Sequence, residues 1–230
     1  MVGRFCRLVP LDPDQHALEL HAANMADAAD AMWTYLPYGP FASLEIYRAW
    51  LHEQARGDDP LFYTILDNTT AKPLGLAAYL RILPASGSIE VGHLNYSPLL
   101  QRTPAATEAM FLMMQRAFAL GYRRYEWKCD ALNAKSRAAA LRLGFSFEGV
   151  FRQATVYKGR NRDTAWFSIL DREWPALEAA FRRWLEPSNF NERGAQRVRL
   201  SELTAPQRAP GVPPGLDSMT PGAAAKSSHS

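Results

Sequence analysis

The sequence is short of two features that mark other classes of protein. Cysteine occurs only twice in 230 residues, as Cys6 and Cys129, and neither lies in a Cys-x-x-Cys or Cys/His cluster. This pattern argues against a metal site and a disulfide framework, so we expect two reduced, buried thiols. No apolar run reaches the roughly 20 residues that cross a bilayer. The first residues also lack the apolar run of a signal peptide, and we expect a cytoplasmic protein with no membrane span.

A strong charge of one sign is missing as well. The formal net charge is +3, and the arginines are scattered along the chain. Nucleic-acid binding needs clustered cations that follow a phosphate backbone, so we expect no nucleic-acid partner. The sequence pI near 8.9 suits an anionic small ligand without requiring one.

The hydrophobic pattern predicts an alternation of helices and strands. Two helices are expected first, over 12–25 and 43–57, and three strands follow, over 61–67, 73–83 and 88–96. The remaining elements are expected as a helix over 105–121, a strand over 122–130, a helix over 133–143, strands over 147–158 and 164–171, and a helix over 172–186. This order predicts a mixed α/β domain, with antiparallel hairpins around a strand–helix–strand–helix centre.

The composition changes near residue 187. Residues 187–230 are rich in Pro, Gly, Ser and Ala and carry few large apolar side chains. Such a segment cannot offset the entropy cost of ordering, so we expect a folded domain over 1–186 and a largely disordered tail over 187–230. The stretch AQRVRLSELT within it is expected to form a short strand or helical turn if it docks.

Two loops that start helices could hold a ligand. In EVGHLNYSPLLQRTPAATEAM a strand leads into a helix, whose free N–H groups and partial positive charge favour phosphate. Thr103 or Thr107 could cap this helix, and Arg102 adds charge. In DALNAKSRAAALRLGF, Asn133 and Ser136 lie about one turn apart at the next helix start. Taken separately, each loop is explained better by helix capping alone than by a ligand.

Taken together, the motifs carry a family resemblance. The pattern N-x-x-S-x-x-A-x-x-x-L-G-F-x-x-E-G over 133–149, followed by R…G…RD, resembles the GNAT N-acetyltransferase superfamily. It looks most similar to the branch that acetylates ribosomal-protein N-termini. The resemblance implies a GNAT fold: a central mixed, mostly antiparallel sheet, flanked by helices, whose two middle strands splay apart. It also implies acetyl-CoA as acetyl donor and allows for a homodimer.

The same resemblance implies residues for the donor. Its pantetheine arm would enter the gap between the strands IEVGHLNYS and YRRYEWKCD, where Asn133 would hold it and Ser136 would lie near the sulfur. The loop and helix start after the first strand would cradle the pyrophosphate, through Leu99, Leu100, Gln101, Arg102, Thr103, Ala105, Ala106 and Thr107.

The sequence departs from the family pattern at two positions. Pro104 stands where the phosphate loop usually has glycine, and proline has no N–H to donate, although it suits the first turn of a helix. Ala140 stands where many members carry a tyrosine that protonates the departing thiolate. We therefore expect Ser136 to supply that proton.

Glu90 and His93 on the first of these strands are candidate bases for the amine proton. The Glu in IEVG matches a family pattern. His93 is favoured because the ordinary pKa of histidine is closer to neutral pH than that of glutamate. Because their numbers differ by an odd count, we expect them on opposite faces of the strand. A surface ion pair for Glu90, or a histidine satisfied within the sheet, explains each residue equally well. Asp163 also matches the family, and a turn-ordering carboxylate paired with an arginine is the simpler interpretation.

The acceptor pocket is expected to form from the loop MWTYLPYGPF and the last hairpin, with an aromatic wall of Trp33, Tyr35, Tyr38 and Phe41. An ordinary aromatic core explains these residues as well. The sequence thus predicts an acetyl-CoA-dependent N-acetyltransferase that acts in a ternary complex on a primary amine, either a small molecule or a peptide N-terminus. The alternative hypothesis is a module of the same fold that binds acyl-CoA without catalysis, which Pro104 and Ala140 favour.

Overall fold

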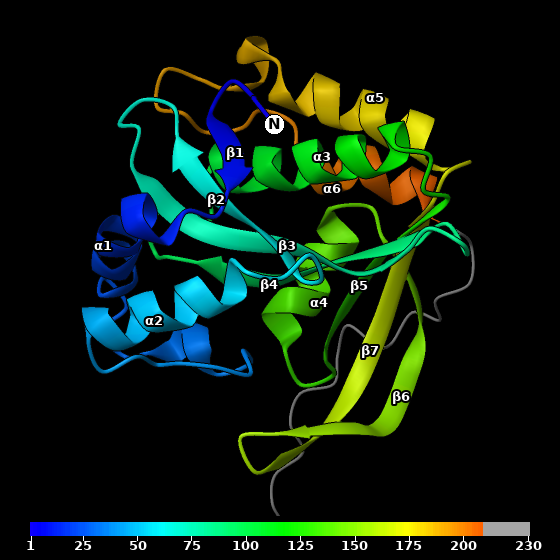
Figure 1. The fold of residues 1–230 in the computed structure, drawn as a ribbon. Helices are drawn as coiled ribbons and strands as arrows, with labels where there is room; N and C mark the ends of the chain where they lie inside the picture. Colours follow the sequence, from blue (N-terminus) through cyan, green and yellow to red (C-terminus); the bar gives the residue numbers. More distant parts are fainter. Residues whose placement is uncertain (209–230) are drawn as a thin grey trace, which may run out of the picture.

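The computed structural model describes residues 1–208, which fold around one seven-stranded sheet with helices on both faces (Figure 1). This architecture confirms the expected mixed α/β class. The strands are β1 Cys6–Pro10, β2 Leu61–Asp67, β3 Pro73–Leu83, β4 Ser88–Tyr96, β5 Arg124–Asp130, β6 Ser146–Tyr157 and β7 Arg160–Leu170. The α-helices are α1 Pro13–Asn24, α2 Leu44–Gln54, α3 Pro104–Ala119, α4 Ala134–Arg142, α5 Trp174–Leu185 and α6 Leu200–Thr204.

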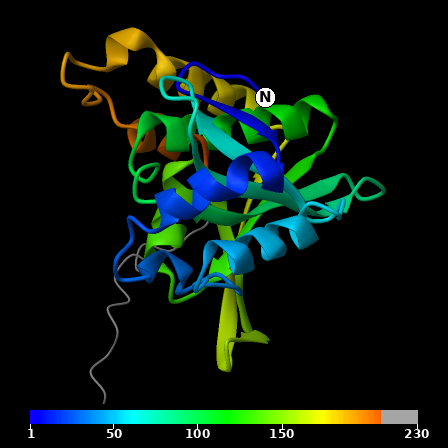
Figure 2. The ribbon, with the colours of Figure 1, turned by 60° about the vertical axis from the view of Figure 1, so that its left-hand side comes forward.

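The strand order is β1-β2-β3-β4-β5-β7-β6, and every neighbouring pair is antiparallel except β4 and β5. The sequence pattern did not predict β1, which has only five residues. The β6–β7 hairpin extends well beyond the other strands, as two views of the ribbon agree (Figures 1 and 2). A central parallel pair inside an antiparallel sheet therefore marks the middle of the molecule.

The sheet separates two hydrophobic clusters, as the alternation along β3 shows. Leu76 and Ala78 pack with α1 and α2 on one face, called here the first face. Ala77 and Tyr79 point to the second face, which α3, α4 and α5 cover. Side chains alternate along a strand, so this parity assigns the residues of neighbouring strands to a face.

Local sequence signals set where the long helices begin. Asp12, Ser43 and Thr103 cap α1, α2 and α3, and each side-chain oxygen accepts a backbone N–H from the first turn. Pro104 occupies the first turn of α3, where a missing N–H costs no helical hydrogen bond. The start of α3 is therefore well formed despite the departure from the family pattern.

The segment after residue 186 packs against the domain, in contrast to the expected disorder from 187 onward. Leu200 of α6 is fully buried in the main core, and the Thr204 hydroxyl donates to the Arg142 carbonyl oxygen at 2.9 Å. The Asn189 side chain donates to the Trp184 carbonyl oxygen and accepts from the Val198 N–H. The few apolar residues of 187–208 thus pack against the core beside α4 and α5. The rest of the expected tail lies outside the described residues.

Within residues 1–208, the helices are too short or too polar to cross a membrane.

Candidate active site

The two central strands separate halfway along their length. Parallel pairing joins 88–91 of β4 to 124–127 of β5, and it ends at Val91 and Trp127. Beyond this point β4 continues to Tyr96 against β3, and β5 continues to Asp130 against β7. Two strand ends therefore face each other without pairing, and α3 and α4 begin in the loops that follow them. This is the expected opening between the middle strands.

A β-bulge in β4 changes the face to which His93 points. Between two pairs with β3, Ala78 with Gly92 and Leu76 with Asn95, β4 has one residue more than its partner. His93 takes up this extra residue with a left-handed φ of 51°. Its ring stacks on Tyr38 at 5.7 Å between centroids, on the first face. Such an insertion reverses the alternation of side chains.

Glu90 lies on the same face. Glu90 pairs with Leu80 in β3. A Cβ atom added to Gly92 would point to the first face, where it would lie 2.9 Å from the Leu80 side chain and 3.8 Å from the Glu90 carboxylate. The expectation that Glu90 and His93 point to opposite faces is therefore wrong, because the strand is not regular between them. Both candidate bases line the first face at the point where β4 leaves β5.

His93 is neutral over the physiological pH range. Burial, with a smaller effect of the Arg81 charge, lowers its pKa to about 4. Rings of Tyr38 and Phe62 flank the imidazole, and Nδ1 is buried without a hydrogen-bond partner among the described residues. The neutral imidazole thus keeps a free nitrogen.

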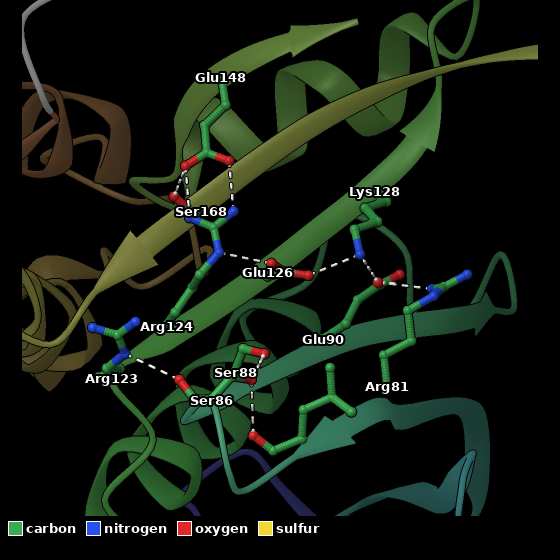
Figure 3. A network of polar contacts seen from close by, with 11 residues as sticks. Arg81, Ser86, Ser88, Glu90, Arg123, Arg124, Glu126, Lys128, Glu148 and Ser168 are labelled. Carbon is green, nitrogen blue, oxygen red and sulfur yellow. Dashed lines mark hydrogen bonds and ion pairs between the residues drawn. The ribbon is translucent and has the colours of Figure 1, made fainter. Parts of the chain in front are cut away.

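Glu90 is held in a buried ion-pair network (Figure 3). One carboxylate oxygen of Glu90 contacts Arg81 Nη1 at 2.7 Å and Lys128 Nζ at 2.8 Å. Lys128 also contacts Glu126 at 2.8 Å, and its side chain is only 8% exposed. Arg124 links Glu126 to Glu148. The sequence alternative of a surface ion pair was right about the pairing, but the Glu90 side chain is 96% buried.

Asn133 and Ser136 form the start of α4 beside β5. Asn133 Oδ1 accepts the Ser136 N–H at 3.1 Å, so the capping interpretation holds for this oxygen. The side-chain amide nitrogen of Asn133 is not used by the cap. Ser136 Oγ accepts a hydrogen bond from Trp127 Nε1 at 3.0 Å, and this bond does not use the hydroxyl proton of Ser136. Trp127 is on the second face, so the opening lies between these residues and the two candidate bases.

The neighbouring Cys129 does not fit the role of a nucleophile. It is buried and free, as is Cys6, and burial raises the pKa of the Cys129 thiol against a smaller lowering effect of Ser136. The reactive form of cysteine is the thiolate, which this environment disfavours. A covalent acyl-cysteine route is therefore poorly supported by this site.

The expected phosphate loop turns tightly between β4 and α3. Arg102 adopts a left-handed φ of 63°, and the Thr103 hydroxyl accepts the Ala106 N–H at 3.2 Å. The Gln101 side chain folds back to donate to the Tyr96 carbonyl oxygen. Side chains of Leu100, Ala105 and Thr107 are buried, whereas those of Leu99, Gln101 and Arg102 are exposed.

The residues expected to bind the acetyl donor suit its pyrophosphate only partly. Thr107 Oγ1 already accepts a hydrogen bond from Arg142 at 3.1 Å. Pro104 offers no N–H, so an anion at this helix start would depend on neighbouring amides and on the Arg102 guanidinium. The fit to the pantetheine arm is better, because the opening between β4 and β5 leaves strand edges unpaired and Asn133 keeps its amide N–H groups.

The aromatic loop forms a wall on the first face. Trp33, Tyr38 and Phe41 pack on one another at 5.5–6.4 Å between ring centroids, and Trp50 and Phe62 join them. The Tyr35 hydroxyl instead donates to the Leu132 carbonyl oxygen, just before Asn133. Three of the four expected aromatic residues therefore assemble beside His93, and Tyr35 ties the loop to the start of α4.

Sequence reasoning missed the partners of the candidate residues. Arg81 and Lys128 pair with Glu90, and Trp127 donates a hydrogen bond to Ser136, but the sequence pattern did not point to these three residues. The polar alternation of Glu126, Lys128 and Asp130 in RYEWKCD does indicate one polar face of β5. Only the strand order of the sheet shows which strands lie next to β5 and contribute to that face. The Asp163 carboxylate accepts from the Gln153 N–H and the Asn161 amide, so it orders this turn as expected, but within residues 1–208 it forms no ion pair with an arginine.

Comparison with known proteins assigns the family. Residues 6–146 match the family described as an acetyltransferase (GNAT) domain. A GCN5-related N-acetyltransferase from Brucella melitensis is 49% identical, with a TM-score of 0.87 over 89% of this chain and 93% of its own. A probable acetyltransferase of the GNAT family from Chromobacterium violaceum is 46% identical, with a TM-score of 0.72 over 76% and 87%. The comparison with curated proteins gives no match.

A third structure bears on the expected branch. A ribosomal L7/L12 alpha-N-protein acetyltransferase has a TM-score of 0.63 and 21% identity, over 74% of this chain and 92% of its own. Identity this low supports a shared fold but not a shared acceptor, so the branch stays a prediction. The profile match covers more than half of the sequence, and the first relative is nearly half identical. The chain therefore belongs to the GNAT acetyltransferase family.

Proposed function

We propose that the protein transfers an acetyl group from acetyl-CoA to a primary amine by direct attack in a ternary complex. The single observation that carries this proposal is the opening between β4 and β5, which has Asn133 and Ser136 on one side and His93 and Glu90 on the other. The opening gives donor and acceptor separate approaches to one point. The raised pKa of the Cys129 thiol supports direct attack over a covalent enzyme intermediate.

When bound, acetyl-CoA supplies a thioester carbonyl for attack and a thiolate as leaving group. The residues of the chain then have distinct tasks. The Asn133 side-chain amide is placed to bind the pantetheine arm. The Ser136 hydroxyl, oriented by Trp127, is placed to donate a proton to the departing sulfur. The aromatic wall of Trp33, Tyr38 and Phe41 excludes water from the acceptor side.

Of the two candidate bases, His93 fits proton removal better. Its Nδ1 is unpartnered and neutral above a pH of about 4, so it can accept the amine proton directly or through a water molecule. The Glu90 carboxylate is occupied by Arg81 and Lys128. We assign Glu90 to holding the ends of β3, β4 and β5 together at the start of the opening.

The alternative function, acyl-CoA binding without catalysis, is favoured by Pro104 and Ala140. Ala140 is fully buried, and its side chain carries no hydroxyl that could protonate a thiolate. In that case the protein binds acetyl-CoA but releases no thiol with any amine.

Calorimetry with acetyl-CoA, followed by a thiol-release assay over small amines and short peptides, separates the two functions. We expect saturable binding and amine-dependent release of CoA. A matched control is His52→Asn, which replaces a partly exposed histidine of α2 that contacts Asp14. It should keep full activity, whereas His93→Asn should lose most of it. Binding without thiol release supports the alternative function, and no binding at millimolar acetyl-CoA contradicts both.

A further inference from the structure

Two side chains of β7 present unsatisfied hydrogen-bond donors on the first face. Arg162 and Trp166 are four residues apart on a strand that pairs with β5 in regular register, Asp130 with Thr164 and Lys128 with Trp166. Side chains at even spacing share a face, so both lie on the side of Lys128. Arg162 Nε and Trp166 Nε1 are each buried and lack a hydrogen-bond partner within residues 1–208. Buried donors are normally paired, so this pair calls for an explanation.

Two neighbouring side chains hold the Trp166 ring in place. Phe151 stacks on the ring at 4.5 Å between centroids, and Lys128 Nζ lies 3.8 Å from the ring centroid. An indole nitrogen is a donor only, so an oxygen is the group it lacks. Lys128 is the residue of β5 at which the strand leaves β4, which puts this donor beside the opening.

Arg162 differs from the other cationic residues of the first face in having no carboxylate partner among the described residues. Arg81, Arg124 and Lys128 each contact at least one carboxylate, as Figure 3 shows. No carboxylate of the described chain lies within ion-pair distance of Arg162. Its guanidinium stands 5.8 Å from the Tyr157 ring, whose hydroxyl donates to Asp130 at 2.8 Å. Arg162 therefore has its charge free for a ligand.

Two further cations belong to the same hairpin: Lys158 follows Tyr157 in the chain, and the Arg160 guanidinium lies 5.5 Å from the Tyr157 ring. Lys158 Nζ donates to the Trp33 carbonyl oxygen at 2.8 Å, and Arg160 Nη2 donates to the Thr34 carbonyl oxygen at 2.9 Å. These bonds attach the β6–β7 hairpin to the aromatic loop with neutral acceptors, so the positive charges are not cancelled. This part of the hairpin thus holds three cations, Lys158, Arg160 and Arg162, that form no ion pair within residues 1–208, and their charge outweighs that of the nearby Asp130 carboxylate, which attracts anions and repels polycations.

We infer that Arg162 and Trp166 form the specificity subsite for the acceptor, and that the acceptor is an amine that also carries a carboxylate or phosphate group. A guanidinium and an indole N–H on one strand face provide two N–H donors for anionic oxygen, the kind of hydrogen bond that charge strengthens. The inference rests on the proposed function, because it names the amine that the opening receives. The hairpin cations make polyamines poor acceptors.

The test compares amines that differ in one group. Ethanolamine, L-serine and O-phosphoethanolamine share an aminoethanol skeleton, and spermidine represents polycations. Initial rates of CoA release are measured for the full-length protein and for Arg162→Gln, Arg162→Lys and Trp166→Phe. Trp166→Phe keeps a ring against Phe151 and Lys128 but removes the N–H. Arg172→Gln is the matched control, since it removes an equal charge at an exposed position in the turn before α5.

We expect kcat/KM for serine or phosphoethanolamine to exceed that for ethanolamine by at least about tenfold, with spermidine lowest. Arg162→Gln and Trp166→Phe should each raise KM for the preferred anionic acceptor about tenfold, with little change in kcat or in the affinity for acetyl-CoA. Arg162→Lys should recover part of the loss, and Arg172→Gln should behave as the parent protein. The preferred partner, serine or phosphoethanolamine, identifies the anionic group.

Other outcomes contradict the inference in ways that can be told apart. Turnover of ethanolamine or spermidine at or above that of the anionic amines contradicts the subsite but leaves the proposed function intact. Equal losses for ethanolamine and the anionic amines in Arg162→Gln assign a purely structural role to Arg162. Absence of turnover with every amine, although acetyl-CoA binds, contradicts the proposed function and the inference together.

Discussion

Replacement of His93 by asparagine gives the most direct test of the site, because the structure assigns this imidazole an unusual pKa. Burial lowers that pKa to about 4 from an ordinary value of 6.5. Asparagine does not titrate, and it tolerates the left-handed backbone of this bulge better than most residues. The substitution removes the titration and leaves the bulge with a compatible residue.

The sign and size of the effect follow from proton linkage. Between pH 6.5 and about 4 the unfolded chain binds a proton at His93 that the folded chain does not bind. The stability contribution of this residue is therefore complete above pH 6.5 and is lost as the pH falls to about 4. A pKa difference of about 2.5 corresponds to about 3 kcal/mol in the free energy of unfolding.

The assay is chemical denaturation at a series of pH values, for the parent protein and for His93→Asn. The variant loses ring packing on Tyr38 and Phe62 at every pH, so the measured quantity is the difference in pH dependence. We expect the parent to lose about 3 kcal/mol more than the variant between pH 7 and pH 4. His16, whose pKa burial also lowers, cancels in this difference. Parallel curves, or an imidazole resonance of His93 that titrates near 6.5, would refute the assigned burial.

Three further substitutions test neighbouring parts of the structure. Ser136→Ala should lower kcat about 10- to 100-fold with little change in the Kd of acetyl-CoA, and intact turnover would move the proton donor to water or another side chain. Asn133→Ala should weaken acetyl-CoA binding about tenfold in calorimetry and lower stability by about 1 kcal/mol through the lost cap; an unchanged Kd would leave only the capping role. Glu108 accepts the backbone N–H groups of Arg4, Phe5 and Cys6 at 2.6–2.9 Å. Glu108→Gln should therefore lower the free energy of unfolding by about 3 kcal/mol in a denaturant titration, and a loss below about 1 kcal/mol would show that water replaces these bonds.

The sequence predicted the order of the helices and strands well, except for β1. It could not give the bulge at His93, because the extra residue is defined only by the pairing of β4 with β3. The regular alternation expected for IEVGHLNY therefore placed Glu90 and His93 on opposite faces, which is wrong. Likewise, Lys128 lies 38 positions after Glu90 in the chain, and only the parallel pairing of β4 with β5 brings the two together.

The segment after 186 shows the same limit. Its composition, with few apolar residues, predicts that the segment cannot fold by itself. Leu200 is nonetheless fully buried, because α4 and α5 provide the apolar surface that the segment lacks. Burial of one side chain thus depended on surfaces contributed by elements distant in the sequence.

Two levels of organisation therefore contribute to this protein. The sequence by itself determined closely where α1, α2, α3 and α4 begin, because a helix cap needs only neighbours one turn away; only the structure decided between Thr103 and Thr107 as the cap of α3. It also determined, through the motif around Asn133, the family to which the chain belongs. The tertiary structure alone decided which polar side chains share the first face: the free nitrogen of His93, the neutralised Glu90 and the unpaired donors of Arg162 and Trp166. These relations depend on strand register and burial, which arise when distant segments pack together and water is excluded.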